Sequence, residues 1–230
     1  MSDRIILAIE TSKRASSLCL CLNGTTHTSV LGDGKQQGSD LIPQIKSFLA
    51  EHQVAPESVS DLALHVGPGG STGLRMGIAL AQGFSMVYPN IKIHAVPLEA
   101  MALELLLKLE VPQNKAMLLA DAYGGSVFVQ RYNKVDNDFQ YDGQIEIQSR
   151  EDVLAYSEEC AIVPDLGHLR EKLEWPAQMC FIEDSFPNAS LVLAVVQKSD
   201  EYVKPIQEID VRYLKASSAE INWQKRQEGK

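Results

Sequence analysis

Two polar loops contain the residue types in this chain that could do chemistry. One is the turn Glu10-Thr11-Ser12 after an apolar run, and the other is the segment Gly67 to Gly73, in which four of seven residues are glycine. Successive backbone N–H groups of a glycine-rich loop before a helix can cradle a phosphate. A tight strand-to-helix turn needs the same glycines. The residues of the predicted nucleotide site are Thr11, Ser12, Gly67 and Gly69.

Other signatures of catalysis and metal binding are missing from the sequence. The glycine-rich loop continues with Leu74 and Arg75, whereas a Walker A loop needs Lys followed by Ser or Thr. The histidines form no HxxxH or HExxH pair and lie in no GxSxG-type motif: His27, His52, His65, His94 and His168. We therefore predict no catalytic residue and no metal ligand.

The four cysteines show no CxxC spacing, and Cys19 and Cys21 lie two residues apart in an apolar run, which places them on one face of a strand. Together with Cys160 and Cys180 they are predicted to be buried thiols in a reducing compartment rather than metal or redox groups.

Composition restricts the class of protein. The chain has 230 residues, of which 45% are hydrophobic, enough for a substantial core. Its net charge of −9 opposes unassisted binding to a polyanion, because phosphate affinity depends on clustered cations. The first apolar run spans about six residues, too short for a signal peptide or a membrane span, so we expect a cytoplasmic protein without a membrane partner.

The hydrophobic periodicity predicts an α/β fold. Strands are expected at 5–9, 17–22 and 26–31, then a helix from Ser39 to near His52, a strand at 61–66, a helix at 74–87, a strand at 91–96 and a helix at 98–108. Asn23-Gly24 marks a hairpin. Three meandering strands followed by alternating helices and strands are typical of a ribonuclease-H-like unit.

A boundary is predicted at Val111-Pro112-Gln113-Asn114, after which new strands are expected at 116–120 and 126–132. The division is 1–110 for an N-terminal subdomain with docking helices and 111–230 for a degenerate second subdomain. The charged segment 213–230 is expected to form a tail or helix that packs back on the first subdomain.

The two predicted helices at 39–52 and 74–87 carry a possible docking surface. Small residues at Gly73, Gly77 and Ala81 recur every four positions, and each glycine in a helix costs about 1 kcal/mol relative to alanine. Packing on the protein's own sheet is one explanation, and close approach of a partner helix is the other. The residues predicted to dock a partner are Leu41, Ile45, Phe48, Gly73, Leu74, Gly77 and Ala81.

Two motifs together resemble the TsaB/TsaD family. These are Leu7-Ala8-Ile9-Glu10-Thr11-Ser12 and the loop that reads GPGGSTGLRMG from Gly67 to Gly77, close to the family's usual GPGSFTGLRxG. Further similar segments are Leu41-Ile42-Pro43, Asp121-Ala122 and Tyr213-Leu214-Lys215. The resemblance covers nearly the whole chain and implies an actin-like ATPase fold of two small subdomains.

Within that family the chain resembles the shorter, non-catalytic TsaB (YeaZ) type. The metal-binding HxxxH helix of TsaD corresponds here to Pro97-Leu98-Glu99-Ala100-Met101, and Lys13-Arg14-Ala15 stands where TsaD has acidic residues. The chain also departs from the usual TsaB pattern at Gln37-Gly38, where His-Ser is common, and at Gly70-Ser71, where Ser-Phe is common.

The resemblance implies a subunit that docks to catalytic TsaD through the two N-terminal helices, with TsaE and TsaC alongside, in threonylcarbamoyladenosine modification of tRNA. It implies only indirect contact with tRNA, a homodimer when TsaD is absent, and no required cofactor, with ATP or ADP at the interface of the complex. The alternatives are an autonomous nucleotide-binding regulator and an actin-like ATPase or kinase.

Overall fold

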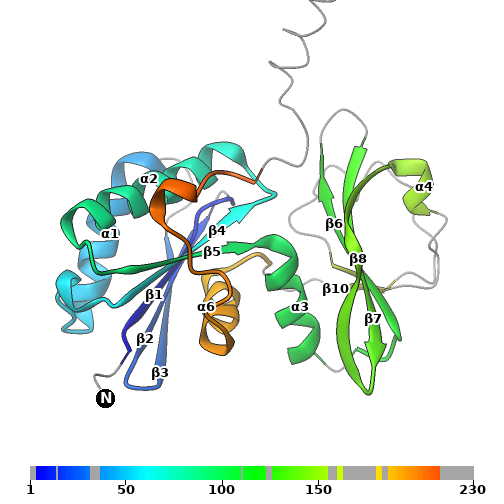
Figure 1. The fold of residues 1–230 in the computed structure, drawn as a ribbon, viewed down its shortest axis with the longest axis horizontal. Helices are drawn as coiled ribbons and strands as arrows, with labels where there is room; N and C mark the ends of the chain where they lie inside the picture. Colours follow the sequence, from blue (N-terminus) through cyan, green and yellow to red (C-terminus); the bar gives the residue numbers. More distant parts are fainter. Residues whose placement is uncertain are drawn as a thin grey trace, which may run out of the picture.

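The structure is a computed structural model that describes residues 4–13, 15–31, 37–109, 111–122, 126–154, 160–162, 180–182 and 186–212 (Figure 1). The strands are β1 Ile6–Glu10, β2 Ser16–Leu22, β3 Thr25–Leu31, β4 Asp61–Gly67, β5 Lys92–Pro97, β6 Lys115–Asp121, β7 Ser126–Val135, β8 Asp138–Ser149, β9 Cys160–Ile162 and β10 Cys180–Ile182. The helices are α1 Gln37–Glu51, α2 Ser71–Val87, α3 Leu98–Lys108, α4 Arg150–Leu154 and α6 Ala189–Lys198, with short 3-10 turns η1 Pro56–Ser58 and η2 Ile206–Glu208.

The first sheet has the strand order β3-β2-β1-β4-β5. The pairs β1–β2 and β2–β3 are antiparallel, and β1–β4 and β4–β5 are parallel. Asn23 and Gly24 both have positive φ, 50° and 75°, as a two-residue hairpin turn requires. This arrangement confirms the predicted α/β, ribonuclease-H-like order of elements.

Alternate residues of β1 and β2 face opposite sides of this sheet, because strand side chains alternate. Leu7, Ile9 and Leu18 pack with α1 and α2 on one side. Ile6, Ala8, Cys19 and Cys21 pack with α3 and α6 on the other side. The predicted burial of Cys19 and Cys21 is confirmed, whereas only the backbone of Cys160 and Cys180 is described.

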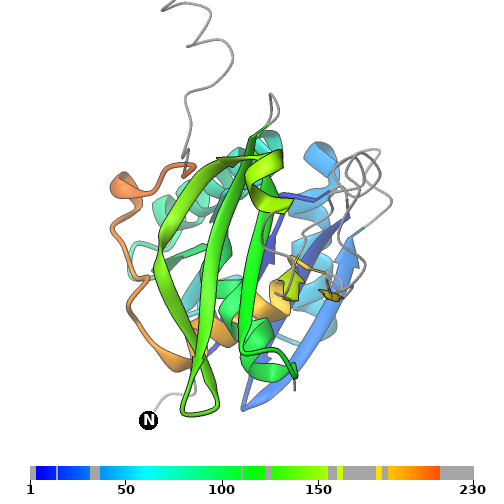
Figure 2. The same cartoon turned by 90° about the vertical axis from the view of Figure 1, so that its right-hand side faces the viewer.

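The second sheet has the order β10-β9-β6-β7-β8, with an antiparallel β6-β7-β8 meander and two short parallel strands beyond β6. Figure 2 looks onto this sheet, with the first sheet behind it. Helix α3 lies between the sheets in Figure 1, and residues of α3, α6, β6 and β7 belong to one continuous core. The two sheets are therefore joined by a shared core.

Helix α6 comes from the second half of the sequence but contacts β1 and β2 of the first sheet. Asn188 caps it by accepting a hydrogen bond from the backbone N–H of Leu191 at 3.1 Å. The division into 1–110 and 111–230 as separate subdomains remains a prediction. The segment 213–230, with the motif Tyr213-Leu214-Lys215, lies outside the described residues, and so does most of the interval between β9 and α6.

The predicted elements of the first half agree with the structure apart from their ends. The main difference is at α2, which begins at Ser71, whereas the glycine-rich pattern predicts a loop up to Gly73. Gly70 is the residue before the helix, so Ser71, Thr72 and Gly73 form its first turn. The part of the glycine-rich segment that is a loop is shorter than predicted.

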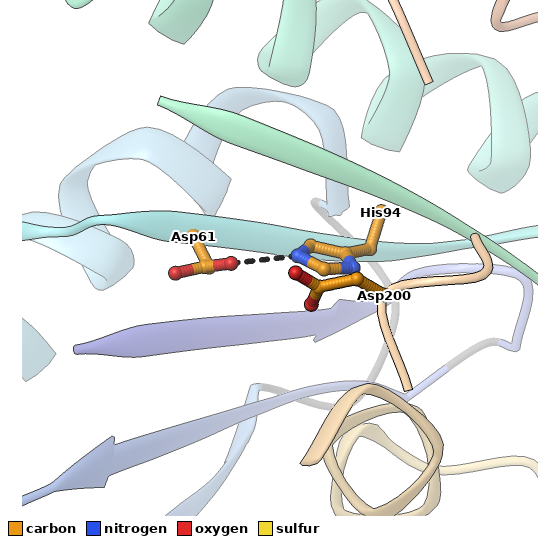
Figure 3. Close-up of side chains that lie close together, drawn as sticks. All are labelled: Asp61, His94 and Asp200. Atoms are coloured by element: carbon orange, nitrogen blue, oxygen red, sulfur yellow. Dashed lines mark hydrogen bonds and ion pairs between the residues drawn. The ribbon is translucent and has the colours of Figure 1, made fainter. Parts of the chain in front are cut away.

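A polar cluster fastens the segment after α6 to the first sheet (Figure 3). Buried Asp61 on β4 is 2.7 Å from Nε2 of His94 on β5, and Arg4 lies 2.7 Å from Asp61 and 2.8 Å from Asp200. Backbone hydrogen bonds from Ala95 to Tyr202 and from Lys204 to Ile93 continue the attachment along β5. The segment from Asp200 to Lys204 is thus tied to the edge of the sheet.

Asp61, His94 and Asp200 are the only group of three potential metal ligands that lie close together among the described residues. Nη2 of Arg4 is within 3.3 Å of an atom of each of them. The guanidinium therefore occupies the position in which a cation would be held, and the cluster is a set of hydrogen bonds and ion pairs.

Burial raises the pKa of the Asp61 carboxyl, but hydrogen bonds from His94, Arg4 and Ser60 lower that pKa by more, so it lies well below its usual value. A carboxyl whose pKa is lowered by folding stabilises the protein fully above its unfolded pKa of about 4 and loses this contribution as the pH falls. The cluster should therefore weaken in acid.

We expect Asp61→Asn to lower the free energy of unfolding by about 3 kcal/mol at neutral pH, because Arg4 and His94 lose their buried anionic partner. The difference between the variant and the wild type should shrink below about pH 4, where Asp61 begins to bind a proton in the unfolded wild type. Urea unfolding of both proteins across this pH range measures it.

Asp138→Asn, which changes an exposed carboxylate at the start of β8, is the control and should have nearly the same small effect at every pH. A deficit in Asp61→Asn that does not change with pH would contradict the role assigned to the ionised carboxylate.

Candidate functional site

The turn after β1 and the glycine-rich loop after β4 lie against each other. They meet because β1 and β4 are parallel neighbours, so their carboxyl ends reach the same edge of the sheet. Thr11 Oγ1 donates a hydrogen bond of 2.8 Å to the carbonyl oxygen of Gly73. Gly69 lies beside Ser12, since a Cβ on Gly69 would be 3.0 Å from the Ser12 Cβ. The structure thus brings all predicted nucleotide-site residues to one edge.

At three positions of the glycine-rich segment the structure requires glycine. A Cβ on Gly70 would overlap the carbonyl oxygen of Ser12, and one on Gly73 would overlap the carbonyl oxygen of Thr11. Gly67 has φ of +114°, a conformation that other residues rarely adopt. These contacts support the tight-turn interpretation, and nucleotide binding at Thr11, Ser12, Gly67 and Gly69 remains a prediction.

A buried acid and histidine lie beneath the loop. Glu10 Oε1 accepts hydrogen bonds from the backbone N–H of Ser12 at 2.6 Å and from the Ser12 hydroxyl, and it is 3.2 Å from Nδ1 of His65. Glu10 Oε2 and His65 Nε2 have no hydrogen-bond partner among the described residues. Sequence reasoning did not select His65; its place on the strand before the loop was the available signal.

The side chains predicted to dock a partner are buried in the chain's own core. Five of them belong to the core between the first sheet and helices α1 and α2: Leu41, Ile45, Phe48, Leu74 and Ala81. Gly73 and Gly77 are also buried, and a Cβ on Gly77 would lie 2.9 Å from Thr11 Oγ1. These side chains pack inward on the protein's own sheet, which supports the first of the two explanations given for the small residues, and their role in docking a partner remains a prediction.

An apolar groove of about 240 Å³ lies between the outer faces of α1 and α2. Of the residues predicted to dock a partner, Ile45 lines this groove, although its side chain is buried. Ile42 on α1 is 55% exposed and Val87 on α2 is 66% exposed, although both are aliphatic. Gly83 also lines the groove, and a Cβ built there would meet no atom within 4 Å. In Figure 1 the two helices lie side by side on the outside of the first sheet. Gly83 is therefore a small residue of α2 that faces free space in the groove.

Helix α3 and the residue before it contain no histidine. Pro97 ends β5, and Met101 on α3 is fully buried in the core. Glu99 lies between them and forms an ion pair with Arg212. These side chains can pack and hold a salt bridge, but Pro97 and Met101 offer no imidazole to a metal ion.

The close contact at Gly73 leads to a prediction about stability. Gly73→Ala should lower the free energy of unfolding by more than about 3 kcal/mol, because the added methyl group overlaps a backbone oxygen that cannot rotate away. Gly83→Ala on the same helix is the matched control and should raise stability by about 1 kcal/mol. Thermal or urea unfolding of both variants measures these changes. A Gly73→Ala protein as stable as the wild type would contradict the prediction, because the turn after β1 would then move aside at little cost in free energy.

No helix within the described part of the chain is both long enough and apolar enough to cross a bilayer.

Residues 35–220 match the family model described as "TsaD: tRNA N6-adenosine threonylcarbamoyltransferase". The chain is 26% identical over 238 residues, 98% of each chain, to the "tRNA threonylcarbamoyladenosine biosynthesis protein TsaB" of Haemophilus influenzae. It is 31% identical to TsaB of Escherichia coli over 81 residues, 35% of each chain.

The fold is similar to that of YeaZ from Pseudomonas aeruginosa, with a TM-score of 0.74 and 20% identity over 92% of this chain and 100% of that one. The family match spans most of the sequence, and it includes the glycine-rich loop and α2 described above. The chain therefore belongs to the TsaB (YeaZ) and TsaD family, and its match over nearly all of both chains is to a TsaB protein of tRNA threonylcarbamoyladenosine biosynthesis.

Proposed function

We propose that this chain is a non-catalytic subunit that docks to TsaD through the apolar groove between α1 and α2. The observation that carries the proposal is the exposure of Ile42 and Val87, together with half-buried Phe84, around a groove that buried Ile45 and Leu49 also line. Exposed apolar surface of this kind marks interaction sites, because its burial against a partner removes it from water.

The shape of the groove suits another helix. Leu80, Gly83 and Val87 follow one another at helical spacing along α2, and Ile42 and Lys46 do so along α1. Gly83 leaves room for a partner backbone to come close. Two helices from each partner would form a four-helix seam, and in the absence of TsaD a second copy of this chain would use the same groove.

The chemistry of threonylcarbamoyl transfer is assigned to TsaD. Pro97 and Met101 replace the two histidines of the metal-binding helix, and the Oε1 atom of Glu99 is engaged by Arg212. The net charge of −9 favours indirect contact with tRNA through TsaD, with TsaE in the same complex. ATP or ADP at the interface of the complex, and a cytoplasmic location, are part of the proposal, and the chain itself requires no cofactor.

The purified chain alone should transfer no threonylcarbamoyl group to tRNA, because its α3 lacks the metal-ligand pair. Transfer assayed with the isolated chain, with TsaD, and with both proteins tests this. Transfer without TsaD would overturn the non-catalytic role, and ATP turnover or stoichiometric metal in the isolated chain would favour an autonomous enzyme.

Gly83→Leu should abolish or strongly weaken pairing with TsaD while the protein stays folded. The leucine would fill open space in the groove and hold a partner helix away, which we expect to raise the Kd at least about tenfold, or about 1.4 kcal/mol. Titration of labelled TsaD measures the Kd, and a melting curve of the same variant checks the fold.

Gln82→Leu is the matched control, since Gln82 is exposed on α2 but lies outside the groove. It adds the same apolar group one residue away and should leave the Kd nearly unchanged. If Gly83→Leu pairs like the wild type, the seam is elsewhere; if both variants fail, pairing does not depend on the groove specifically.

A further inference from the structure

A second cavity, of about 830 Å³, lies between the first sheet, the second sheet and the segment from Glu201 to Arg212. Its walls include Pro97 at the end of β5, Glu99 on α3, Tyr141 and Ile145 on β8, and the segment after α6. In Figure 2 that segment and β8 lie on the same side of the molecule. Cavities of this size accommodate small organic ligands. Neither the glycine-rich loop nor the α1/α2 groove contributes to it.

The cavity has an excess of negative charge. Four carboxylates line it, Glu99, Glu201, Glu208 and Asp210, against two basic side chains, Lys204 and Arg212. Arg212 is paired with Glu99 Oε1, so its charge is already balanced. A cavity lined mostly by one sign of charge attracts ligands of the opposite sign.

Glu99 has a hydrogen-bonding position that no described residue fills. The side chain of Glu99 is only 10% exposed, and Arg212 binds its Oε1 atom. The Oε2 atom has no hydrogen-bond partner in the part of the chain that the structure describes. A buried carboxylate oxygen is normally hydrogen-bonded, because it has given up its water. A ligand with an N–H donor would supply the missing partner.

Two tyrosines line the cavity. Tyr141 belongs to β8 and Tyr202 to the segment after α6, and their hydroxyl groups are hydrogen-bonded to each other. Aromatic rings beside carboxylates favour organic cations, since the ring face attracts an ammonium or guanidinium group. A metal ion would need ligand atoms gathered around one point, and the only such group in the described part of the chain is the separate one around Arg4.

We propose that this inter-sheet cavity binds an organic cation, a protonated amine or a guanidinium group, through Glu99, Glu201 and Glu208 and the rings of Tyr141 and Tyr202. The cation comes either from a free polyamine or from an exposed Lys or Arg side chain of a protein, and both share this chemistry. This site is independent of docking to TsaD.

The test is calorimetric titration of the full chain with spermidine and, separately, with arginine amide, at low salt and at about 150 mM salt. We expect saturable binding of at least one of them at a single site. Tighter spermidine binding identifies a free polyamine as the ligand type, and tighter arginine amide binding identifies a protein side chain. Triethylene glycol, which is uncharged, should not bind.

Two variants locate the site. Glu99→Gln should weaken binding at least tenfold, but it also loses the ion pair with Arg212. The double variant Glu201→Gln/Glu208→Gln leaves that pair intact, changes only exposed side chains, and should also weaken binding at least tenfold. Glu57→Gln, an exposed acid on η1 outside the cavity, should bind like the wild type.

Three outcomes would overturn the proposal. The first is no binding of either cation at low salt. The second is an equal loss of affinity in Glu57→Gln and the cavity variants, which would mean general attraction to an acidic protein. The third is full affinity in both Glu99→Gln and the double variant.

Discussion

The parallel pairing of β1 with β4 is the constraint on which the rest of the first half depends. It places the turn after β1 and the start of α2 at one edge of the sheet, where the Thr11 hydroxyl binds the Gly73 carbonyl oxygen. Backbone atoms come so close there that Gly70 and Gly73 have no room for a side chain. The axis of α2, and with it the direction of its outer face, follows from this contact.

The same constraint separates two kinds of small residue on one helix. Gly73, Gly77 and Ala81 face the sheet, where their size lets the helix pack closely on β1 and β4. Gly83 faces outward, beside the exposed Val87 and opposite Ile42 of α1. The small residues that face the sheet stabilise the fold of the monomer. The outward-facing Gly83 lies in an apolar groove, whose exposure to water is unfavourable.

The chain after α6 connects the regions of the molecule. Helix α6 covers the first sheet, and the next residues are tied to β5 by the ion pair of Asp200 with Lys92 and by backbone hydrogen bonds. Further along the chain, Arg212 pairs with Glu99 on α3. The cavity between the sheets exists because this segment forms its third wall. The acidic side chains of the segment, Glu201, Glu208 and Asp210, give the cavity its charge.

The sequence by itself determined the strand and helix order of the first half, because periodicity and turn residues such as Asn23-Gly24 are local properties. The family resemblance rests equally on local motifs. Whether a helical glycine faces the core or the solvent is not a local property. Gly77 and Gly83 look alike in the sequence, and only the packing of Gly77 against Thr11 distinguishes them.

The same holds for the rest of the structure. The sequence analysis assigned neither the long strand β8 nor helix α6, and α6 packs on β1 and β2, which precede it by about 170 residues. Glu99 and Arg212, or Arg4 and Asp200, meet only after the whole chain has folded, since each pair is more than 100 residues apart. Tertiary structure alone decided which side chains face the groove, which face the core and which line the cavity, because these positions depend on distant segments that no local pattern encodes.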